Sequence, residues 1–235
     1  MPLEPLSPAA FAFIAQVDEA YAALTQRAPQ LGGKLFYAGN LTEPACAAVV
    51  AANIAGAATL AASPDRAGAK QAMHAGQVDF VVNSLDEALR ILKNQVRKRE
   101  TAAVCVTVEP ESIEQEMEIR GVQPDLFFSD LEANAMGEAN TAVWLTWRAA
   151  QSPALWLPRL DAIALGCLDA AAATARRWIE RAPRYLGRLT QNLRLLRTTQ
   201  PYVDQFTAQL NAQIAAGVIT VPIEIEVGPW GSSPN

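Results

Sequence analysis

Residues 31–66 read LGGKLFYAGNLTEPACAAVVAANIAGAATLAASPDR and contain two apolar stretches with a helical segment between them. The first stretch, residues 35–38, runs through Gly39 into the helical segment, and the second covers residues 58–62. Apolar strands separated by one helix are typical of a βαβ unit, whose two strands lie parallel in one sheet. This segment therefore predicts an α/β fold.

Three more apolar segments with strand character follow the first two. They lie at residues 78–82, 102–108 and 125–128. Helical segments alternate with the strands, and each begins at a proline or a capping residue: residues 42–55, 64–75, the helix opened by the capping box SLDE at 84–87, and 110–120. This alternation predicts a five-stranded parallel Rossmann-like sheet, with helices on both faces and right-handed connections.

The segments before and after the predicted sheet differ from it in composition and in predicted secondary structure. Residues 1–30 hold an amphipathic leading helix, residues 31–130 form the Rossmann-like domain, and residues 131–235 predict a mainly α-helical extension. Within the extension we expect one long helix over residues 160–182, then helices over 183–199 and 201–216. Residues 218–227 alternate in polarity, and Pro222 favours an edge strand there. Four tryptophans, at 144, 147, 156 and 178, are expected to bury a helical layer.

The composition of the chain argues against several classes of function. The chain has 235 residues, 51% of them apolar, and a formal net charge of −5. An acidic chain argues against nucleic acid as the main partner, because that binding depends on neutralising phosphates. No apolar run reaches the roughly 18 residues of a membrane span, and the first residues lack a basic leader. The three separated cysteines suggest buried thiols, so we expect a cytoplasmic protein with neither nucleic acid nor membrane as a partner.

The turn after the first strand reads GNLTEP over residues 39–44. Dinucleotide binding at such a turn needs a G-x-G-x-x-G-like run, because glycine lets the backbone approach the pyrophosphate at a helix N-terminus. Here Gly39 is the one glycine, Pro44 has no N–H, and Glu43 would repel a phosphate at that helix start. We therefore expect no dinucleotide cofactor at this turn.

A series of short segments carries a family resemblance. They read LGGKL at 31–35, AG at 38–39, AANIAGA at 51–57, SLDEAL at 84–89, and RGVQPDL at 120–126 leading to Asp130. In order and approximate spacing they resemble the central NAD-binding domain of urocanase (urocanate hydratase), which adds water to urocanate with tightly bound NAD as the electrophile. The resemblance covers about residues 31–130. It implies a Rossmann-like fold and, by resemblance only, NAD as a cofactor.

The chain departs from the family pattern in four places. GNLTEPA at residues 39–45 replaces a glycine-rich turn that resembles GLGGMGG in the family. The ribose-binding acid is missing, since AASP stands at 61–64 and Asp65 follows in the next turn. A TDQTSAHD-like run is replaced by SDLEANAM at 129–136, which keeps only Asp130. Urocanases are also longer, and we find no equivalent of their flanking segments in this sequence.

Candidate ligand-binding residues follow four of the predicted strands. They are Gly39, Asn40, Thr42 and Glu43 after the first strand, Ser63 after the second, Asn83 after the third, and Asp130 and Glu132 after the fifth. The carboxyl edge of an open α/β sheet is where such folds place ligands. The first turn could suit a neutral or cationic ligand, and Asp130 is the candidate catalytic residue. In the competing interpretation these polar residues only cap helices and turns.

Two other features lie outside this edge. His74 is the only histidine, so no multi-histidine metal site is expected, and its place at a helix end favours a dipole partner. Seven arginines lie between residues 176 and 197, against the single acid Glu180. We interpret this cluster as a solvated face, or as a surface that pairs with the acidic β/α part, in preference to a ligand pocket.

Three hypotheses follow for the function. The first is a urocanase-related protein that has lost standard NAD binding and urocanate hydration and acts as a small-molecule-binding or interaction module, with no cofactor. The second is a diverged lyase or hydratase that uses a nucleotide-type cofactor at the sheet edge. The third is a structural homodimer built on the helix at 160–182 and the strand at 218–227. The expected partners are an unknown small molecule, a second copy or another protein.

Overall fold

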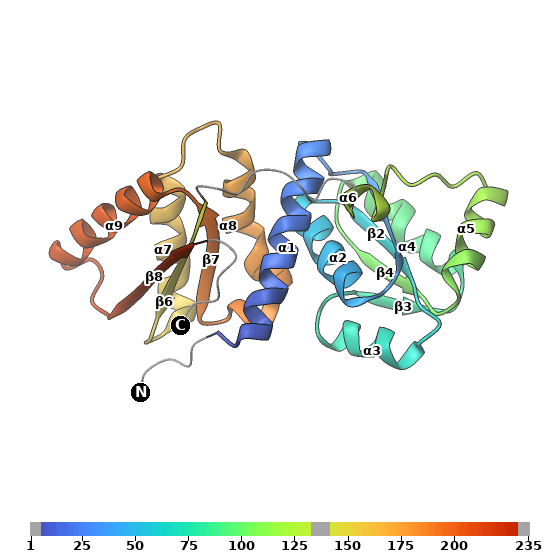
Figure 1. Ribbon diagram of the computed structural model, residues 1–235, viewed down its shortest axis with the longest axis horizontal. Coiled ribbons are helices and arrows are strands. Elements are labelled where there is room, and N and C mark those ends of the chain that lie inside the picture. Colours follow the sequence, from blue (N-terminus) through green and yellow to red (C-terminus); the bar gives the residue numbers. More distant parts are fainter. Residues whose placement is uncertain (1–5, 133–141, 230–235) are drawn as a thin grey trace. The chain divides into compact units, whose positions relative to one another are not determined.

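The computed structural model describes residues 6–132 and 142–229, which form two compact units (Figure 1). The parallel-sheet unit comprises Gln16–Gly137, and the antiparallel-sheet unit comprises Met1–Ala15 with Glu138–Asn235. Helix α1 (Pro8–Arg27) contributes residues to both units. No helix in the described part of the chain has the length and apolar character needed to cross a membrane.

The parallel-sheet unit contains the predicted strand and helix alternation. Its strands are β1 (Leu35–Asn40), β2 (Ala58–Ala62), β3 (Phe80–Val82), β4 (Ala103–Val106) and β5 (Leu126–Phe127). Its further helices are α2 (Glu43–Ala55), α3 (Arg66–His74), α4 (Leu85–Lys98), α5 (Pro110–Ile119) and α6 (Ser129–Glu132). All strand pairs are parallel, in the order β3-β4-β2-β1-β5. The five-stranded parallel Rossmann-like sheet is therefore confirmed.

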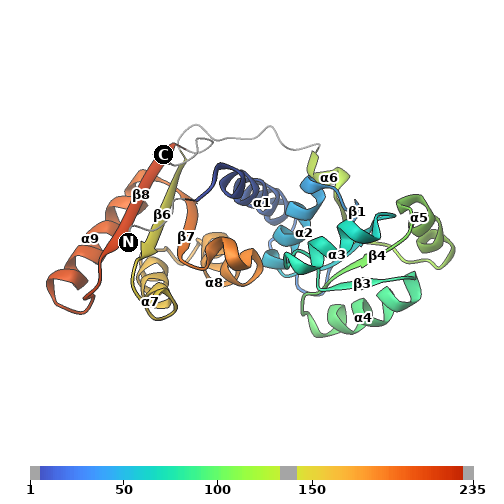
Figure 2. The same ribbon diagram turned by 90° about the horizontal axis from the view of Figure 1, so that it is seen from below.

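The two faces of this sheet are covered by different helices (Figure 2). Alternate strand residues, among them Leu60 and Val104, pack in one core with Leu89 of α4 and Ile113 of α5. Helices α2 and α3 supply none of that core and cover the opposite face. This division follows from handedness, since β1 to β3 run one way across the sheet and the later connections run back.

Side-chain caps start three of these helices. The hydroxyl of Thr42 accepts from the Ala45 N–H, the carboxylate of Asp65 from Ala67, and the hydroxyl of Ser84 from Glu87. Each cap satisfies a backbone donor that the first helical turn leaves without an intrahelical acceptor. Cap sequences therefore set the helix starts to within a residue or two of the predicted positions.

The antiparallel-sheet unit agrees with the sequence prediction only in part. It contains β6 (Val143–Ala149), α7 (Pro153–Gly166), α8 (Ala173–Leu186), the 3₁₀ turn η1 (Gly187–Thr190), β7 (Leu193–Thr198), α9 (Gln200–Ala215) and β8 (Ile223–Pro229). The strands form an antiparallel sheet in the order β7-β6-β8. The helix expected at 201–216 and the edge strand near 218–227 are present, as α9 and β8.

Three expectations for this unit are wrong. Residues 183–199 are not one helix, because the end of α8, η1 and β7 lie there, and residues 160–182 are divided between α7 and α8. The tryptophans do not form a helical layer, since Trp144 and Trp147 lie on β6 while Trp156 and Trp178 lie on helices, although all four are buried. Both faces of β6 are covered, so its sequence lacks the polar alternation that would have predicted a strand.

Candidate functional site

The candidate site is the carboxyl edge of the parallel sheet, where five strand-ending loops meet. The chain leaves β1 and β2 towards the face covered by α2 and α3, and leaves β3 and β4 towards the opposite face. The neighbouring strands β2 and β4 therefore have loops that diverge to opposite faces. That point is the topological switch of the sheet, where open α/β folds place their ligands.

The backbone N–H groups of the turn after β1 are used in hydrogen bonds within the turn and to β2. The Thr42 N–H donates to the Asn40 carbonyl at 2.8 Å, and the Leu41 N–H donates to Ala62 of β2 at 2.9 Å. Gly39 has a φ of +64°, and a side-chain carbon at this position would meet no atom within 4 Å, so the glycine serves the turn and not a close backbone approach. Asn40, Thr42 and Glu43 are exposed at this edge.

Helix α2 offers few donors to an anion at its start. Pro44 has no N–H, and the Ala45 N–H is bonded to Thr42 Oγ1 at 3.4 Å. The Glu43 carboxylate occupies the first turn, where the helix dipole favours negative charge. Of the first three helical positions, Pro44 and Ala45 therefore give no amide to a phosphate, and Glu43 carries a carboxylate.

Ser63 lies at the switch point itself. Its N–H donates to Val106 of β4 at 3.0 Å, and its hydroxyl donates to the Asp65 carbonyl at 3.4 Å. The residue is buried, with 6% of its surface exposed. Asp65, which follows it, caps α3 through the Ala67 N–H at 3.0 Å. The position of the ribose-binding acid of a dinucleotide site is thus held by a buried serine, and the nearby acid serves a helix.

Asn83 joins the ends of β3 and β4. Its N–H donates to the Glu87 carboxylate at 2.9 Å, and its side-chain oxygen accepts from the Thr107 hydroxyl at 3.4 Å. Thr107 and the exposed Glu109, which precedes α5, follow β4 at the switch point, and neither is among the predicted candidates. The sequence did not indicate Thr107 because the predicted strand extends through residue 108, which places Thr107 inside the strand and not in the loop after it.

Asp130 is engaged in structural contacts next to β5. Its carboxylate accepts from the Phe127 N–H at 3.1 Å and pairs with Arg27 at 3.8 Å, and Arg27 also donates to the Asp130 carbonyl at 2.8 Å. Arg27, the last residue of α1, is not among the residues predicted for this edge. The side chain of Glu132, the other candidate in this loop, lies outside the described residues.

The loops of this edge share one property, which is a carboxylate near the start of the following helix. Glu43 stands at the start of α2, Asp65 at α3, Glu87 at α4, Glu109 at α5 and Asp130 at α6. Carboxylates stabilise helix N-termini and repel a phosphate from the same place. Two cations lie among these carboxylates, since Arg27 pairs with Asp130 and Arg66 begins α3. The part of the edge around Glu43 and Glu109 is therefore the part suited to a neutral or cationic group.

Two buried thiols lie below this edge. Burial, followed by the charge of Glu43, raises the pKa of Cys46 to about 11, and burial raises the pKa of Cys105 to about 12. Both are therefore protonated at neutral pH and are poor nucleophiles. Among residues 6–132 and 142–229, no cluster of three histidine, cysteine or acidic side chains could hold a metal ion.

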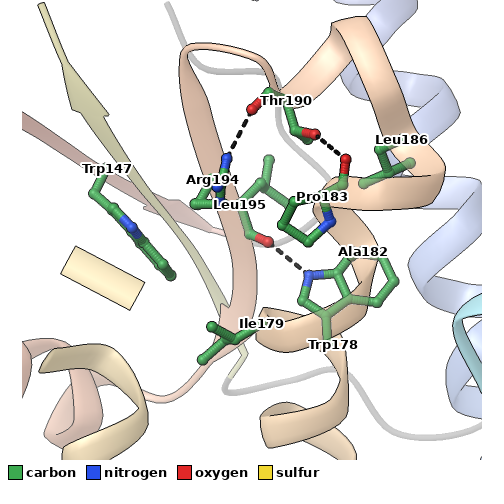
Figure 3. Close-up of a pocket in the computed structure, with 9 residues that line it drawn as sticks. All are labelled: Trp147, Trp178, Ile179, Ala182, Pro183, Leu186, Thr190, Arg194 and Leu195. Atoms are coloured by element: carbon green, nitrogen blue, oxygen red, sulfur yellow. Dashed lines mark hydrogen bonds between the residues drawn. The ribbon is translucent and has the colours of Figure 1, made fainter. Parts of the chain in front are cut away.

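The antiparallel-sheet unit contains a separate small pocket (Figure 3). Its walls come from α8, η1, β6 and β7 and include Trp147, Trp178 and Arg194. The pocket is partly open to solvent, and its volume is about 10 Å³, room for about one water molecule. Trp178 donates its indole N–H to the Leu195 carbonyl at 2.8 Å, so the ring is fixed by the fold. This pocket is too small to serve as a site for an organic ligand in its present form.

A comparison with protein families identifies the ancestry of the parallel-sheet unit. The family described as the urocanase Rossmann-like domain matches residues 15–133. The chain belongs to the urocanase family. The match covers most of α1, the whole parallel sheet and α6, so the resemblance found in the sequence is confirmed.

The residues of this urocanase-family edge do not fit NAD in the manner of a glycine-rich phosphate site. A pyrophosphate at α2 would meet Glu43 and the missing amide of Pro44. A ribose at the end of β2 would meet Ser63, whose hydroxyl is used within its own turn. Dinucleotide binding needs glycine, free amides and an acceptor carboxylate at these places.

Proposed function

We propose that this urocanase-family protein neither binds NAD in the family manner nor hydrates urocanate, and acts as a small-molecule-binding or interaction module. The observation that carries this proposal is the carboxylate at each helix start of the sheet edge, from Glu43 at α2 to Asp130 at α6. These groups suit a neutral or cationic ligand or partner group and disfavour a phosphate.

The arrangement of Asp130 gives the lyase alternative no support. A general acid or base needs a carboxylate that can reach a substrate proton. The carboxylate of Asp130 already accepts from a backbone N–H and pairs with Arg27. We therefore assign Asp130 to the support of the β5 loop.

Calorimetric titration tests the cofactor part of the proposal. We expect no heat of binding with NAD, and ADP to bind no more tightly than adenosine, because the added phosphates meet an acidic edge. Urocanate absorbance should stay constant with the protein and NAD present, with an authentic urocanase as the positive control.

A matched pair of variants separates the electrostatic cause from the shape of the turn. Glu43→Gln with Glu109→Gln removes two exposed carboxylates of the edge, and Glu100→Gln with Glu224→Gln removes two exposed carboxylates elsewhere. Tighter ADP binding in the first pair alone would support the role of these charges. Micromolar NAD binding by the unmodified protein, or turnover of urocanate, would refute the proposal.

A further inference from the structure

Helix α8 carries a row of arginines on the side opposite its buried face. Trp178, Ile179, Ala182 and Leu186 are buried. Arg181 and Arg184 lie three residues apart on the exposed side, and Arg188 follows in η1. Together, Arg181, Arg184 and Arg188 are called the arginine row below.

The arginine row has no carboxylate partner among the described residues. Arg148 pairs with Glu226 and Arg194 pairs with Asp161 in this unit, and neither pair includes a member of the row. Arg184 lies 5.4 Å from the ring centre of its neighbour Tyr185. Glu180 is the one acid of α8 and stands one turn before Arg184, but the two form no described ion pair, so the helix keeps an excess of positive charge. Like charges one helical turn apart repel, so an anionic partner would relieve a cost that the isolated helix bears.

The chain contains a surface of matching charge and spacing on α5. Glu111, Glu114 and Glu118 are exposed and lie three and four residues apart, as the members of the arginine row do. Glu114 also accepts from the Tyr37 hydroxyl at 3.2 Å. Ile119 ends the helix with 77% of its surface exposed, so an apolar side chain adjoins the acids.

We propose that the arginine row of one copy docks on the glutamates of α5 in a second copy of this chain. Arginine pairs with carboxylates through two parallel hydrogen bonds, and the row contains no lysine. The net charge of −5 disfavours a nucleic acid, which would be repelled at long range. The contact joins two different surfaces, so it closes a two-fold dimer where each copy docks on the other, and it extends into a series where it does not.

This inference specifies the interaction module proposed above and rests on that part of it, while the NAD titration tests a separate part. Sedimentation velocity of the full chain over a concentration series gives the direct measurement. In about 0.02 M salt the mean sedimentation coefficient should rise with concentration, and in about 0.5 M salt the rise should vanish, because salt screens exposed charges.

Charge reversals locate the contact. Arg181→Glu with Arg184→Glu, or Glu111→Lys with Glu118→Lys, should each weaken association at least about tenfold by placing like charges together. A mixture of the two variants should associate again, since each then supplies what the other lacks. The control, Arg66→Glu with Lys70→Glu on α3, changes the net charge by the same amount as the arginine reversal and should leave association unchanged.

Three outcomes would overturn the inference. The first is a monomer at every concentration in low salt, which includes the case where the arginine row pairs within its own chain. The second is association that neither reversal weakens. The third is an equal loss in the α3 control, which would make net charge, and not this contact, the cause.

Discussion

The Trp144 ring of β6 lies over Gly228 of the neighbouring strand β8, and it leaves no room for a side chain at that position. A side-chain carbon added at Gly228 would stand 2.6 Å from the Trp144 indole nitrogen. Trp144 is buried, with 5% of its surface exposed, and Phe11 packs edge-on against it at 6.0 Å between ring centres. The buried ring thus lies in contact with both Gly228 and Phe11.

Gly228→Ala should therefore destabilise the fold by about 1–3 kcal/mol, as overpacking of a core does. Urea unfolding followed by tryptophan fluorescence measures the change. Gly166→Ala is the matched control, because nothing lies within 4 Å of the added carbon there and the site is helical. An alanine at 228 that is as harmless as one at 166 would show that the indole moves freely.

The strand β7 is joined to helix α7 by an ion pair with little solvent exposure. Arg194 donates through Nε to Asp161 at 3.0 Å, and Trp147 of β6 donates to the same carboxylate at 3.1 Å. The two charged side chains are 13% and 14% exposed. Burial raises the pKa of Asp161, and the charge and hydrogen bond of Arg194 oppose that rise.

Arg194→Gln should cost about 3 kcal/mol at neutral pH, because it leaves the Asp161 carboxylate buried without its cation. The folded-state pKa of Asp161 then rises further above its unfolded value of about 3.9. A raised acid pKa contributes stability below the unfolded pKa that is lost as pH rises through the folded pKa. The variant should therefore lose more stability than the native chain between about pH 4 and pH 7.

A double-mutant cycle tests the same pair. Asp161→Asn with Arg194→Gln keeps an acceptor for Trp147 and removes both charges, so its cost at neutral pH should be less than the sum of the single changes. Urea unfolding midpoints of the native chain, the two single variants and the double variant are measured at about pH 4 and pH 7. Additive costs would mean that the two side chains act independently.

The whole molecule consists of two units with separate cores, and the urocanase family match lies in one of them. Leu60 is fully buried in the parallel-sheet unit, and Phe206 of α9 is fully buried in the antiparallel-sheet unit, where it packs 5.2 Å from the Trp147 ring. Compact units with their own cores can unfold separately, and a chain that contains two of them need not be two-state.

Scanning calorimetry should therefore show two overlapping transitions. Leu60→Ala should lower one of them, and Phe206→Leu should lower the other, because each variant leaves a cavity in one core. Each variant serves as the control for the other. A single two-state transition that both variants lower equally would mean that the two cores unfold together.

The sequence by itself determined the parallel sheet, the helix starts and the presence of a single glycine in the turn after the first strand. These features depend on local signals: apolar strands, capping residues such as Thr42 and Ser84, and the GNLTEP turn at 39–44. A cap needs only its own helix, and a proline removes an amide wherever it stands. The family resemblance has the same basis, since short segments in order carry it.

The tertiary structure alone decided the strand order, the switch point and the antiparallel sheet. Arg27 meets Asp130 across 103 residues, and no local pattern marks such a pair. The sequence around β7 lacks strict alternation of polar and apolar residues, because Leu195 and Leu196 are both buried. Arg194, on the same face as Leu196, is compensated by Asp161 of α7, which no local pattern marks. Local sequence sets periodicity and caps, whereas the compensation of a buried charge depends on which distant segment packs against it.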